Sequence, residues 1–300
     1  MPDLDEQLIE LLQHDGRASY SELAELAGVS RAVVAGRLST LIGTGAVRVV
    51  AAVHPEFLGL QAYAHVSIHT AGAAADTIPA LVALPAAVFV SAVSGEHDLV
   101  VELRLPNQRE LYATVAVIRG LPGVVSVNTL LYVDVVTGVF MPGKPLPAGL
   151  RIDGVDLELM TALQEDGRRS YRELADQVGL SASSVRSRVT ALVEHQVVRI
   201  GPVLNRRLRS AKAAAGVGIN IDGDGVRAID ALRGLRGVEF IARTIGRFDL
   251  VATISADSAL GLHQVIDSLK SLDDVIRLDS WIHLEVVKER YEWPLPDAGR

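Results

Sequence analysis

Guanidinium and hydroxyl side chains gather at two places in the chain that lie 151 positions apart. The first place holds Arg31 and Arg37, and the second holds Ser183-Ser184 and Arg186-x-Arg188. Arginine and serine side chains bind phosphate oxygens and base edges, so both places could contact DNA. Arg168 and Arg169 add positive charge shortly before the second place. The predicted DNA contacts are therefore Arg31, Arg37, Arg168, Arg169, Ser183, Ser184, Arg186 and Arg188.

Two four-residue motifs, Gly95-Glu96-His97-Asp98 and Gly246-Arg247-Phe248-Asp249, are also separated by 151 positions. Glycine can adopt positive φ and aspartate can cap its own backbone, so both motifs are typical of hairpin turns. A histidine beside an aspartate is more often a surface hairpin residue than a ligand-binding residue. From the residues alone, a simple turn and a ligand site both remain open.

Other kinds of chemistry are not indicated. The chain has no cysteine, and no Ser-His-Asp arrangement, metal-ligand spacing or glycine-rich phosphate loop is recognisable. Asp222-Gly223-Asp224-Gly225 resembles the start of a calcium loop but lacks the remaining ligands, so it predicts a turn. We therefore expect no catalytic residue, no metal and no cofactor.

Charge is distributed unevenly in this chain of 300 residues, whose net charge is −7. Residues 1–50 hold seven acidic and four basic residues, a net of −3, whereas residues 152–212 hold eight acidic and ten basic residues, a net of +2. A local basic patch is enough for nucleic-acid binding. The acidic N-terminal residues are unlike a secretory signal, and no apolar run approaches the roughly 20 residues of a membrane span. We expect a cytoplasmic protein with no membrane partner.

The offset of 151 extends over most of the chain and predicts the elements that must position these residues. Asp15-Gly16-Arg17-x-Ser19-Tyr20-x-Glu22 recurs as Asp166-Gly167-Arg168-x-Ser170-Tyr171-x-Glu173. In both copies an amphipathic helix precedes this motif, and its Ser and Glu fit a capping box for a second helix. A turn with glycine then leads to Ser30 or Ser181, an N-cap for a third helix. This order predicts a helix-turn-helix in each copy, although a three-helix interaction module has the same spacing.

After the helices the hydrophobic period changes from 3.6 to 2, which predicts strands. Each copy shows the order βαββαβ, so we expect an α+β protein whose antiparallel sheets have helices on one face, the ferredoxin-like arrangement. The uncovered apolar faces should pair within the chain. The predicted domains are a helix-turn-helix at 1–48, a ferredoxin-like domain at 49–137, a Pro/Gly linker at 138–150, a second helix-turn-helix at 151–199 and a second ferredoxin-like domain at 200–300.

A helix-turn-helix followed by a βαββαβ domain with Gly-x-x-Asp-Leu resembles the Lrp/AsnC, or feast/famine, family of transcriptional regulators. The match runs through nearly the whole chain twice. The first copy carries the resemblance at Asp5, Asp15-Gly16-Arg17, Glu22-Leu23-Ala24, Gly28-Val29-Ser30, Arg37, Leu41 and Gly95-x-x-Asp98, and the second at the positions 151 residues later.

The resemblance implies a DNA-binding domain joined to a RAM-type domain that senses an amino acid or related metabolite. The partners would be a double-stranded DNA operator, a small effector and further copies of the chain, as a dimer or tetramer of fused chains. The effector would bind near the hairpins, at Gly95, His97, Asp98, Gly246, Phe248 and Asp249. His97 and Phe248 would then make two unlike pockets.

The fusion departs from the usual single-module chain and implies an intramolecular pseudo-dimer. Ala35-Gly36 in the first copy stands where the second has Arg186-Ser187, and a mid-helix glycine costs about 1 kcal/mol relative to alanine. We therefore expect the second helix-turn-helix to be the stronger DNA reader.

Two alternatives remain. The sirohaem decarboxylases are similar in architecture and also occur as fused pairs, and Val198-Arg199-x-Gly201-x-Val203-x-Asn205 resembles one of their segments. However, the decarboxylases have a segment similar to Tyr-Asn-Leu-Trp on the third strand. At this place the present chain has His97-Asp98-Leu99-Val100 and Phe248-Asp249-Leu250-Val251. The other alternative is a ligand-responsive protein that no longer binds DNA.

Overall fold

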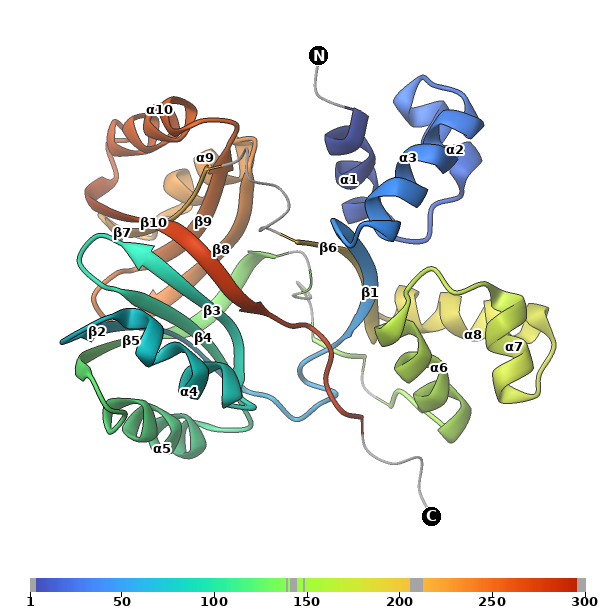
Figure 1. Cartoon of the computed structure of the whole chain (residues 1–300), viewed down its shortest axis with the longest axis horizontal. Helices are drawn as coiled ribbons and strands as arrows, with labels where there is room; N and C mark the ends of the chain where they lie inside the picture. Colours follow the sequence, from blue (N-terminus) through green and yellow to red (C-terminus); the bar gives the residue numbers. More distant parts are fainter. Residues whose placement is uncertain (1–3, 139, 141–144, 148, 206–212, 296–300) are drawn as a thin grey trace. The chain divides into compact units, whose positions relative to one another are not determined.

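The computed structural model describes residues 4–138, 140, 145–147, 149–205 and 213–295. The chain divides into two compact units, and each unit collects corresponding parts of both sequence copies. The first comprises Met1–Leu58, Lys144–Arg209 and Tyr291–Arg300, and the second comprises Gly59–Gly143 and Ser210–Arg290. The elements of both units are labelled in Figure 1. Among the described residues, no helix is long and apolar enough to cross a membrane.

The first unit contains the two predicted helix-turn-helix segments. Both predicted capping boxes are present, because Ser19 and Ser170 each accept from the backbone N–H of a glutamate that bonds back to the serine backbone. Gly28 and Gly179 end the middle helices with φ of 68°, in the left-handed region that glycine tolerates. The helices are α1 (Leu4–His14), α2 (Tyr20–Ala27), α3 (Arg31–Gly43), α6 (Gly154–Glu165), α7 (Tyr171–Val178) and α8 (Ala182–Glu194).

A two-stranded antiparallel ladder joins the two copies within this unit. It consists of β1 (Val47–Val53) and β6 (Val198–Leu204), with Val50 opposite Gly201. Both strands therefore belong with the helix-turn-helix segments, so the division lies about ten residues later in the first copy than the predicted boundary at residue 49. The period-2 pattern predicted these strands, but it carries no information about their pairing partners.

The second unit contains two βαββαβ halves, which confirms the predicted fold class. In each half, apolar side chains from one face of the sheet pack against the two helices. The first half consists of β2 (Ala62–Thr70), η1 (Ala74–Asp76), α4 (Ile78–Ala83), β3 (Ala87–Ser94), β4 (Leu99–Leu105), α5 (Gln108–Arg119) and β5 (Val124–Gly138). The second half consists of β7 (Ala213–Ile221), α9 (Val226–Gly234), β8 (Val238–Ile245), β9 (Leu250–Ala256), α10 (Ala259–Lys270) and β10 (Val275–Glu289).

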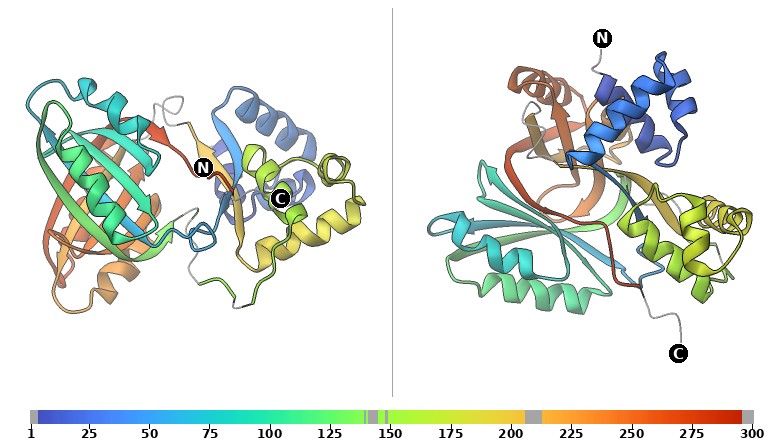
Figure 2. Two further views of the ribbon diagram at one scale, coloured as in Figure 1. Left: turned by 90° about the horizontal axis from the view of Figure 1, so that it is seen from below. Right: turned by 45° about the vertical axis from the view of Figure 1, so that its right-hand side comes forward.

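The eight strands close into one barrel in the order β10-β3-β4-β2-β5-β8-β9-β7. The long last strand of each half forms both seams, because β5 pairs with β2 and with β8, and β10 pairs with β7 and with β3. The helices lie outside the barrel (Figure 2). The two sheets therefore join along their edges as well as facing each other, an arrangement that the sequence did not predict. Edge pairing satisfies backbone groups that an isolated four-stranded sheet would leave open.

The predicted linker at 138–150 lies only partly within the described residues. Gly138 is the last residue of β5, and Leu146 and Leu150 pack against the core of the first unit. The backbone N–H of Leu146 donates to Glu56 Oε2 at 2.9 Å. Residues 139, 141–144 and 148, and the basic segment at 206–212, lie outside the described residues.

Candidate functional site

The third helix of each helix-turn-helix presents polar residues at its first turn. Ser30 caps α3 and Ser181 caps α8, each accepting a backbone N–H through its side chain. Ser181 Oγ also lies 3.0 Å from Ser183 Oγ and 2.8 Å from Ser184 Oγ. The predicted readers that are exposed near these helix starts are Arg31, Ser183, Ser184 and Arg186. They are available to a partner, and their role in DNA contact stays a prediction.

Arg37 and Arg188 have equivalent structural roles in the two copies. The Arg37 guanidinium donates to both carboxylate oxygens of Asp5, at 2.8 and 2.5 Å. Arg188 Nη1 donates to Asp153 Oδ2 at 2.9 Å and to Asp156 Oδ1 at 2.8 Å. These contacts hold the third helix against the first helix of the same copy. The sequence placed both arginines correctly on the third helices but did not show that aspartates engage them.

Arg168 lies at the contact between the two copies of the first unit. Its Nη1 donates to Gly16 O at 2.8 Å and its Nη2 to Ala18 O at 2.9 Å. Arg17 makes the reciprocal contacts, to Gly167 O at 2.6 Å and to Arg169 O at 2.9 Å. We call these four hydrogen bonds the arginine clamp. The guanidinium of Arg168 is directed into the clamp, and its contact with DNA stays a prediction.

The two arginines of the clamp also contact aromatic rings. The Arg17 guanidinium carbon lies 4.4 Å from the Tyr171 ring centroid, and that of Arg168 lies 5.3 Å from the Tyr20 centroid. Each arginine therefore combines hydrogen bonds with a cation–π contact to the other copy. Sequence reasoning missed Arg17 as a functional residue, although the recurrence of Gly-Arg at both turns was the signal that could have revealed it.

Arg169, the remaining predicted contact, binds side chains of its own copy. Its Nη1 donates to Gln177 Oε1 at 3.0 Å and its Nη2 to Glu165 Oε2 at 3.2 Å. The salt bridge with Glu165 has helical i,i+4 spacing and is partly exposed, and contact of Arg169 with DNA stays a prediction.

The two predicted hairpins of the second unit have the expected turn chemistry. Gly95 has φ of 132° and Gly246 has φ of 147°, a region that other residues rarely adopt. Asp98 Oδ2 accepts from the backbone N–H of Thr70 at 2.8 Å, and Asp249 Oδ2 accepts from that of Ile221 at 3.1 Å. Both aspartates therefore cap the end of a neighbouring strand. The glycines and aspartates have structural roles, and their part in effector binding stays a prediction.

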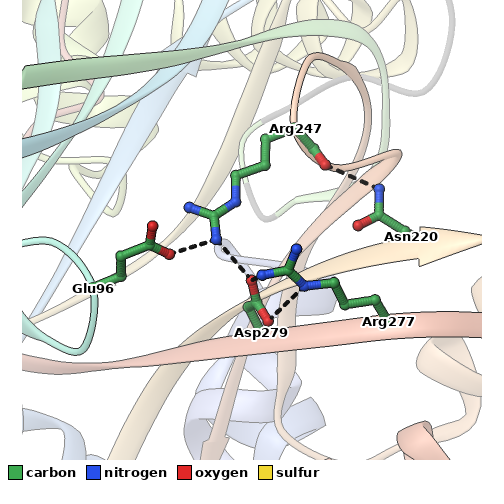
Figure 3. A network of polar contacts seen from close by, with 5 residues as sticks. All are labelled: Glu96, Asn220, Arg247, Arg277 and Asp279. Atoms are coloured by element: carbon green, nitrogen blue, oxygen red, sulfur yellow. Dashed lines mark hydrogen bonds and ion pairs between the residues drawn. The ribbon is translucent and has the colours of Figure 1, made fainter.

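The tips of these hairpins are joined by an ion pair between equivalent positions. Arg247 Nη2 lies 2.5 Å from Glu96 Oε2 and 3.1 Å from Asp279 Oδ2. Arg277 Nη2 also donates to Asp279 Oδ2, at 2.6 Å, so the four residues form one charged network (Figure 3). The hydrogen bond from Arg247 holds the pKa of Glu96 below its usual value. Sequence reasoning did not single out Glu96 or Arg247, although they occupy the same motif position with opposite charge.

His97 and Phe248, the unlike pair of the two hairpins, have different surroundings. Phe248 is 6% exposed and packs with Leu130 and Val251. Its ring covers Gly218, where an added Cβ would lie 2.3 Å from the ring. His97 is half-buried, and burial lowers the pKa of its imidazole. The two halves therefore differ at this position, with a half-buried imidazole in the first and a buried phenyl ring in the second.

Two helix-turn-helix segments and a barrel of two βαββαβ halves define a class of DNA-binding regulators that carry their own ligand-binding domain. The AsnC-type helix-turn-helix domain matches residues 1–42 and 152–193, and the Lrp/AsnC ligand binding domain matches residues 61–137 and 215–293. The chain belongs to the Lrp/AsnC family of transcription regulators, with both domains present twice, as the sequence motifs indicated.

Transcriptional regulators of two Pyrococcus species each match about half of the chain, the length of one copy. The HTH-type transcriptional regulator FL11 of Pyrococcus abyssi is 31% identical over 133 residues, which are 44% of this chain and 88% of the relative. FL11 of Pyrococcus furiosus is 29% identical over 137 residues, 45% of this chain and 91% of the relative. The sirohaem decarboxylase NirDL is similar over both copies, with a TM-score of 0.62 and 16% identity, covering 96% of this chain and 93% of that one. At this identity the last comparison shows a shared fold.

Proposed function

We propose that this regulator binds DNA as an intramolecular pseudo-dimer, in which one chain supplies two unequal readers and α8 is the stronger. The arginine clamp carries the proposal, because it ties the turns of the two helix-turn-helix segments together by four hydrogen bonds. The ladder between β1 and β6 adds a second connection. A pair of readers held in this way suits two half-sites at a set spacing, as in two-fold dimers of helix-turn-helix proteins.

The inequality of the readers is supported by the side chains that are exposed on α3 and α8. On α8, Ser183, Ser184 and Arg186 offer two hydroxyls and a guanidinium. The equivalent positions of α3 hold Ala32, Val33 and Ala35, leaving Arg31 as the charged group of that turn. Hydroxyls and guanidinium groups hydrogen-bond base edges and phosphates, whereas small apolar groups contact thymine methyls. The two half-sites should therefore differ in sequence.

Selection of genomic fragments tests DNA binding directly. Fragments that include the upstream region of the protein's own gene are captured on the full chain at low salt, and the enriched site is then mapped. We expect an asymmetric site with one strongly specified half. A symmetric site would contradict unequal readers, and the absence of enrichment would contradict DNA binding altogether.

We propose that the effector is an amino acid and that it binds near the two hairpins that contain Glu96 and Arg247. Arg247 can bind a carboxylate, and Glu96 and Asp279 can bind an ammonium group. The network in Figure 3 therefore offers an opposite charge to each of the two charged groups of an amino acid. Repeating the fragment selection with and without an amino-acid mixture tests this step. A change in recovery that Arg247→Gln abolishes would support it, whereas equal recovery would contradict it.

We also propose a cytoplasmic homo-oligomer, a dimer or tetramer of fused chains. Large apolar side chains are exposed at equivalent positions of the two long strands, namely Val125 and Ile276, and Val133 and Leu284. Val133 is 63% exposed and Leu284 is 65% exposed. Exposed apolar groups repeated along both strands are suited to contact with another copy. Sedimentation of the full chain, with Val133→Glu/Leu284→Glu as the disruptive variant, tests this assembly.

The alternative function is a sirohaem-decarboxylase-like enzyme, because NirDL shares this fold over both copies. The colour of the purified protein and its absorption after addition of a tetrapyrrole distinguish this function from regulation. Retained tetrapyrrole absorption in the absence of DNA binding would favour the enzyme. DNA enrichment without retained absorption would favour the regulator.

A further inference from the structure

The barrel of the second unit contains buried polar atoms that the hairpin network does not use. Along β2, Ala64, Val66 and Ile68 pack against the helices, so His65 and Ser67 point to the opposite face of the sheet. Three side-chain ring nitrogens of the second unit are buried and have no hydrogen-bond partner among the described residues. They are His65 Nε2, His97 Nδ1 and Trp281 Nε1. Buried polar atoms normally have a partner, so each of them requires an explanation.

His65 is held in one orientation by a relay of two further residues. It is 3% exposed, and its Nδ1 lies 2.7 Å from Glu102 Oε1. Tyr132 donates its phenolic hydrogen to Glu102 Oε2. Burial and the neighbouring carboxylate raise the pKa of Tyr132 well above its ordinary value, so the phenol remains a donor. Glu102 thus accepts from both neighbours and keeps a proton on His65 Nδ1, while Nε2 faces away from the relay.

The indole ring of Trp281 lies beside His65 and over Gly216. Its ring centroid lies 5.3 Å from that of His65, and its indole N–H can only donate. The ring lies over Gly216, where an added Cβ would be 2.1 Å from a ring atom, so this position of β7 has no competing side chain. Burial lowers the pKa of the His97 imidazole.

Apolar side chains pack around Trp281. Leu130, Phe248 and Val251 form one buried cluster with Phe240 and Trp281. Leu130 is also the partner of His65 in the register between β2 and β5. A ligand that reached the nitrogens would therefore contact aromatic and aliphatic groups with the rest of its surface.

We propose that this region binds a small carboxylate with an aromatic or aliphatic body, at a site distinct from the hairpin network. One carboxylate oxygen accepts from Trp281 Nε1, and another accepts from His65 Nε2 after the imidazole has taken up a proton. The imidazolium then donates to two carboxylates, to Glu102 through Nδ1 and to the ligand through Nε2. A neutral amide of the same shape lacks the anionic oxygen that this arrangement requires.

The second half of the barrel does not repeat the site. The positions of His65, Glu102 and Tyr132 are occupied there by Gly216, Thr253 and His283. His283 Nδ1 lies 3.0 Å from Ser91 Oγ, so that imidazole is already hydrogen-bonded. The arrangement therefore predicts one carboxylate per chain, although the chain contains two ligand-binding domains.

The two tryptophans of the chain allow a direct test, because Trp293→Phe leaves Trp281 as the only indole. The full chain with this change is titrated with phenylacetate and, separately, with phenylacetamide, while tryptophan fluorescence is recorded. We expect saturable quenching by one equivalent of phenylacetate, weaker binding as the pH rises, and at least about tenfold weaker binding of the amide. Equal affinity for acid and amide, two equivalents, no pH dependence or no saturable response would each overturn the proposal.

Variants separate this site from others in the molecule. His65→Gln should weaken phenylacetate binding about tenfold or more, whereas His283→Gln and Arg247→Gln should leave it unchanged. Loss of binding with Arg247→Gln alone would place the ligand at the hairpin network and overturn the proposal. If His65→Gln fails to fold, the acid–amide comparison on the parent chain still decides. DNA is absent from these titrations, so the result is independent of whether the protein binds an operator.

Discussion

Arg17 and Arg168 exchange hydrogen bonds between the two copies, each guanidinium donating to two backbone carbonyls near the other's turn. Charged donors on partly buried carbonyls form stronger hydrogen bonds than neutral donors do, and removing a donor leaves its acceptors without that partner. Burial lowers the pKa of Arg168, but an arginine stays protonated. The pair therefore links the two readers irrespective of pH in the range where proteins are stable.

Arg168→Ala should lower the free energy of unfolding of the first unit by about 1 to 3 kcal/mol, because two charge-assisted hydrogen bonds and a cation–π contact are lost. Urea denaturation followed by helical circular dichroism measures this change. Arg172→Ala, an exposed arginine in the same region, is the matched control and should alter stability by less than about 0.5 kcal/mol. Equal effects of the two substitutions would show that the clamp contributes no stability.

Arg186→Ala should weaken operator binding more than Arg31→Ala, because α8 is proposed to be the stronger reader. Neither exposed side chain should affect folding. If Arg186 contacts a phosphate, its removal should also reduce the slope of log affinity against log salt concentration by roughly one. Fluorescence anisotropy on the selected operator at several salt concentrations gives both quantities. Equal losses for the two variants would contradict the asymmetry.

Reversing the charges of Glu96 and Arg247 should reveal the ion pair between the hairpins. Glu96→Arg and Arg247→Glu should each destabilise the second unit, because each places like charges together, and the double variant should recover part of the loss. The Glu96 side chain is 59% exposed, so solvent screening limits the coupling to about 0.2 to 1 kcal/mol. A double-mutant cycle from thermal or urea unfolding measures it, and strictly additive effects would contradict an interaction.

The same pair has a defined pH dependence. Arg247 holds the folded-state pKa of Glu96 below its unfolded value, mainly through a hydrogen bond. The resulting stability is therefore present above the unfolded pKa and disappears as the pH falls through the folded pKa. Glu96→Gln should lower stability near neutral pH and have little effect at strongly acidic pH. An effect of unchanged size across this range would contradict the assignment.

Two glycines of the first unit should respond to alanine with opposite signs. At Gly16 an added Cβ would lie 2.6 Å from the Ile200 carbonyl oxygen, a backbone atom, so Gly16→Ala should cost about 2 kcal/mol or more. At Gly36, within α3, nothing lies within 4 Å of an added Cβ. Gly36→Ala should therefore stabilise the helix by about 0.5 to 1 kcal/mol. Thermal unfolding of both variants tests the pair, and a destabilising effect at Gly36 would contradict the open surroundings.

Local features of the fold were predictable because short-range chemistry sets them. The capping boxes at Ser19 and Ser170, the left-handed glycines at Gly28 and Gly179, and the order βαββαβ all depend on neighbours within a few residues. The helix starts that hold Arg31 and Arg186 followed from the N-cap serines. The partners of Arg37 and Arg188 did not, because their aspartates lie more than 30 positions away in the chain.

The 151-residue repeat and the local residue patterns were sufficient to predict two copies of a helix-turn-helix followed by a βαββαβ domain. Only the tertiary structure showed which residues meet between the copies. Arg17 and Arg168 form a clamp, Glu96 pairs with its own equivalent Arg247, and β5 and β10 close a barrel. The physical reason is that a repeat encodes each module's own fold, whereas pairing between modules depends on complementary charge, hydrogen bonding and strand edges that come into register only when the chain has folded.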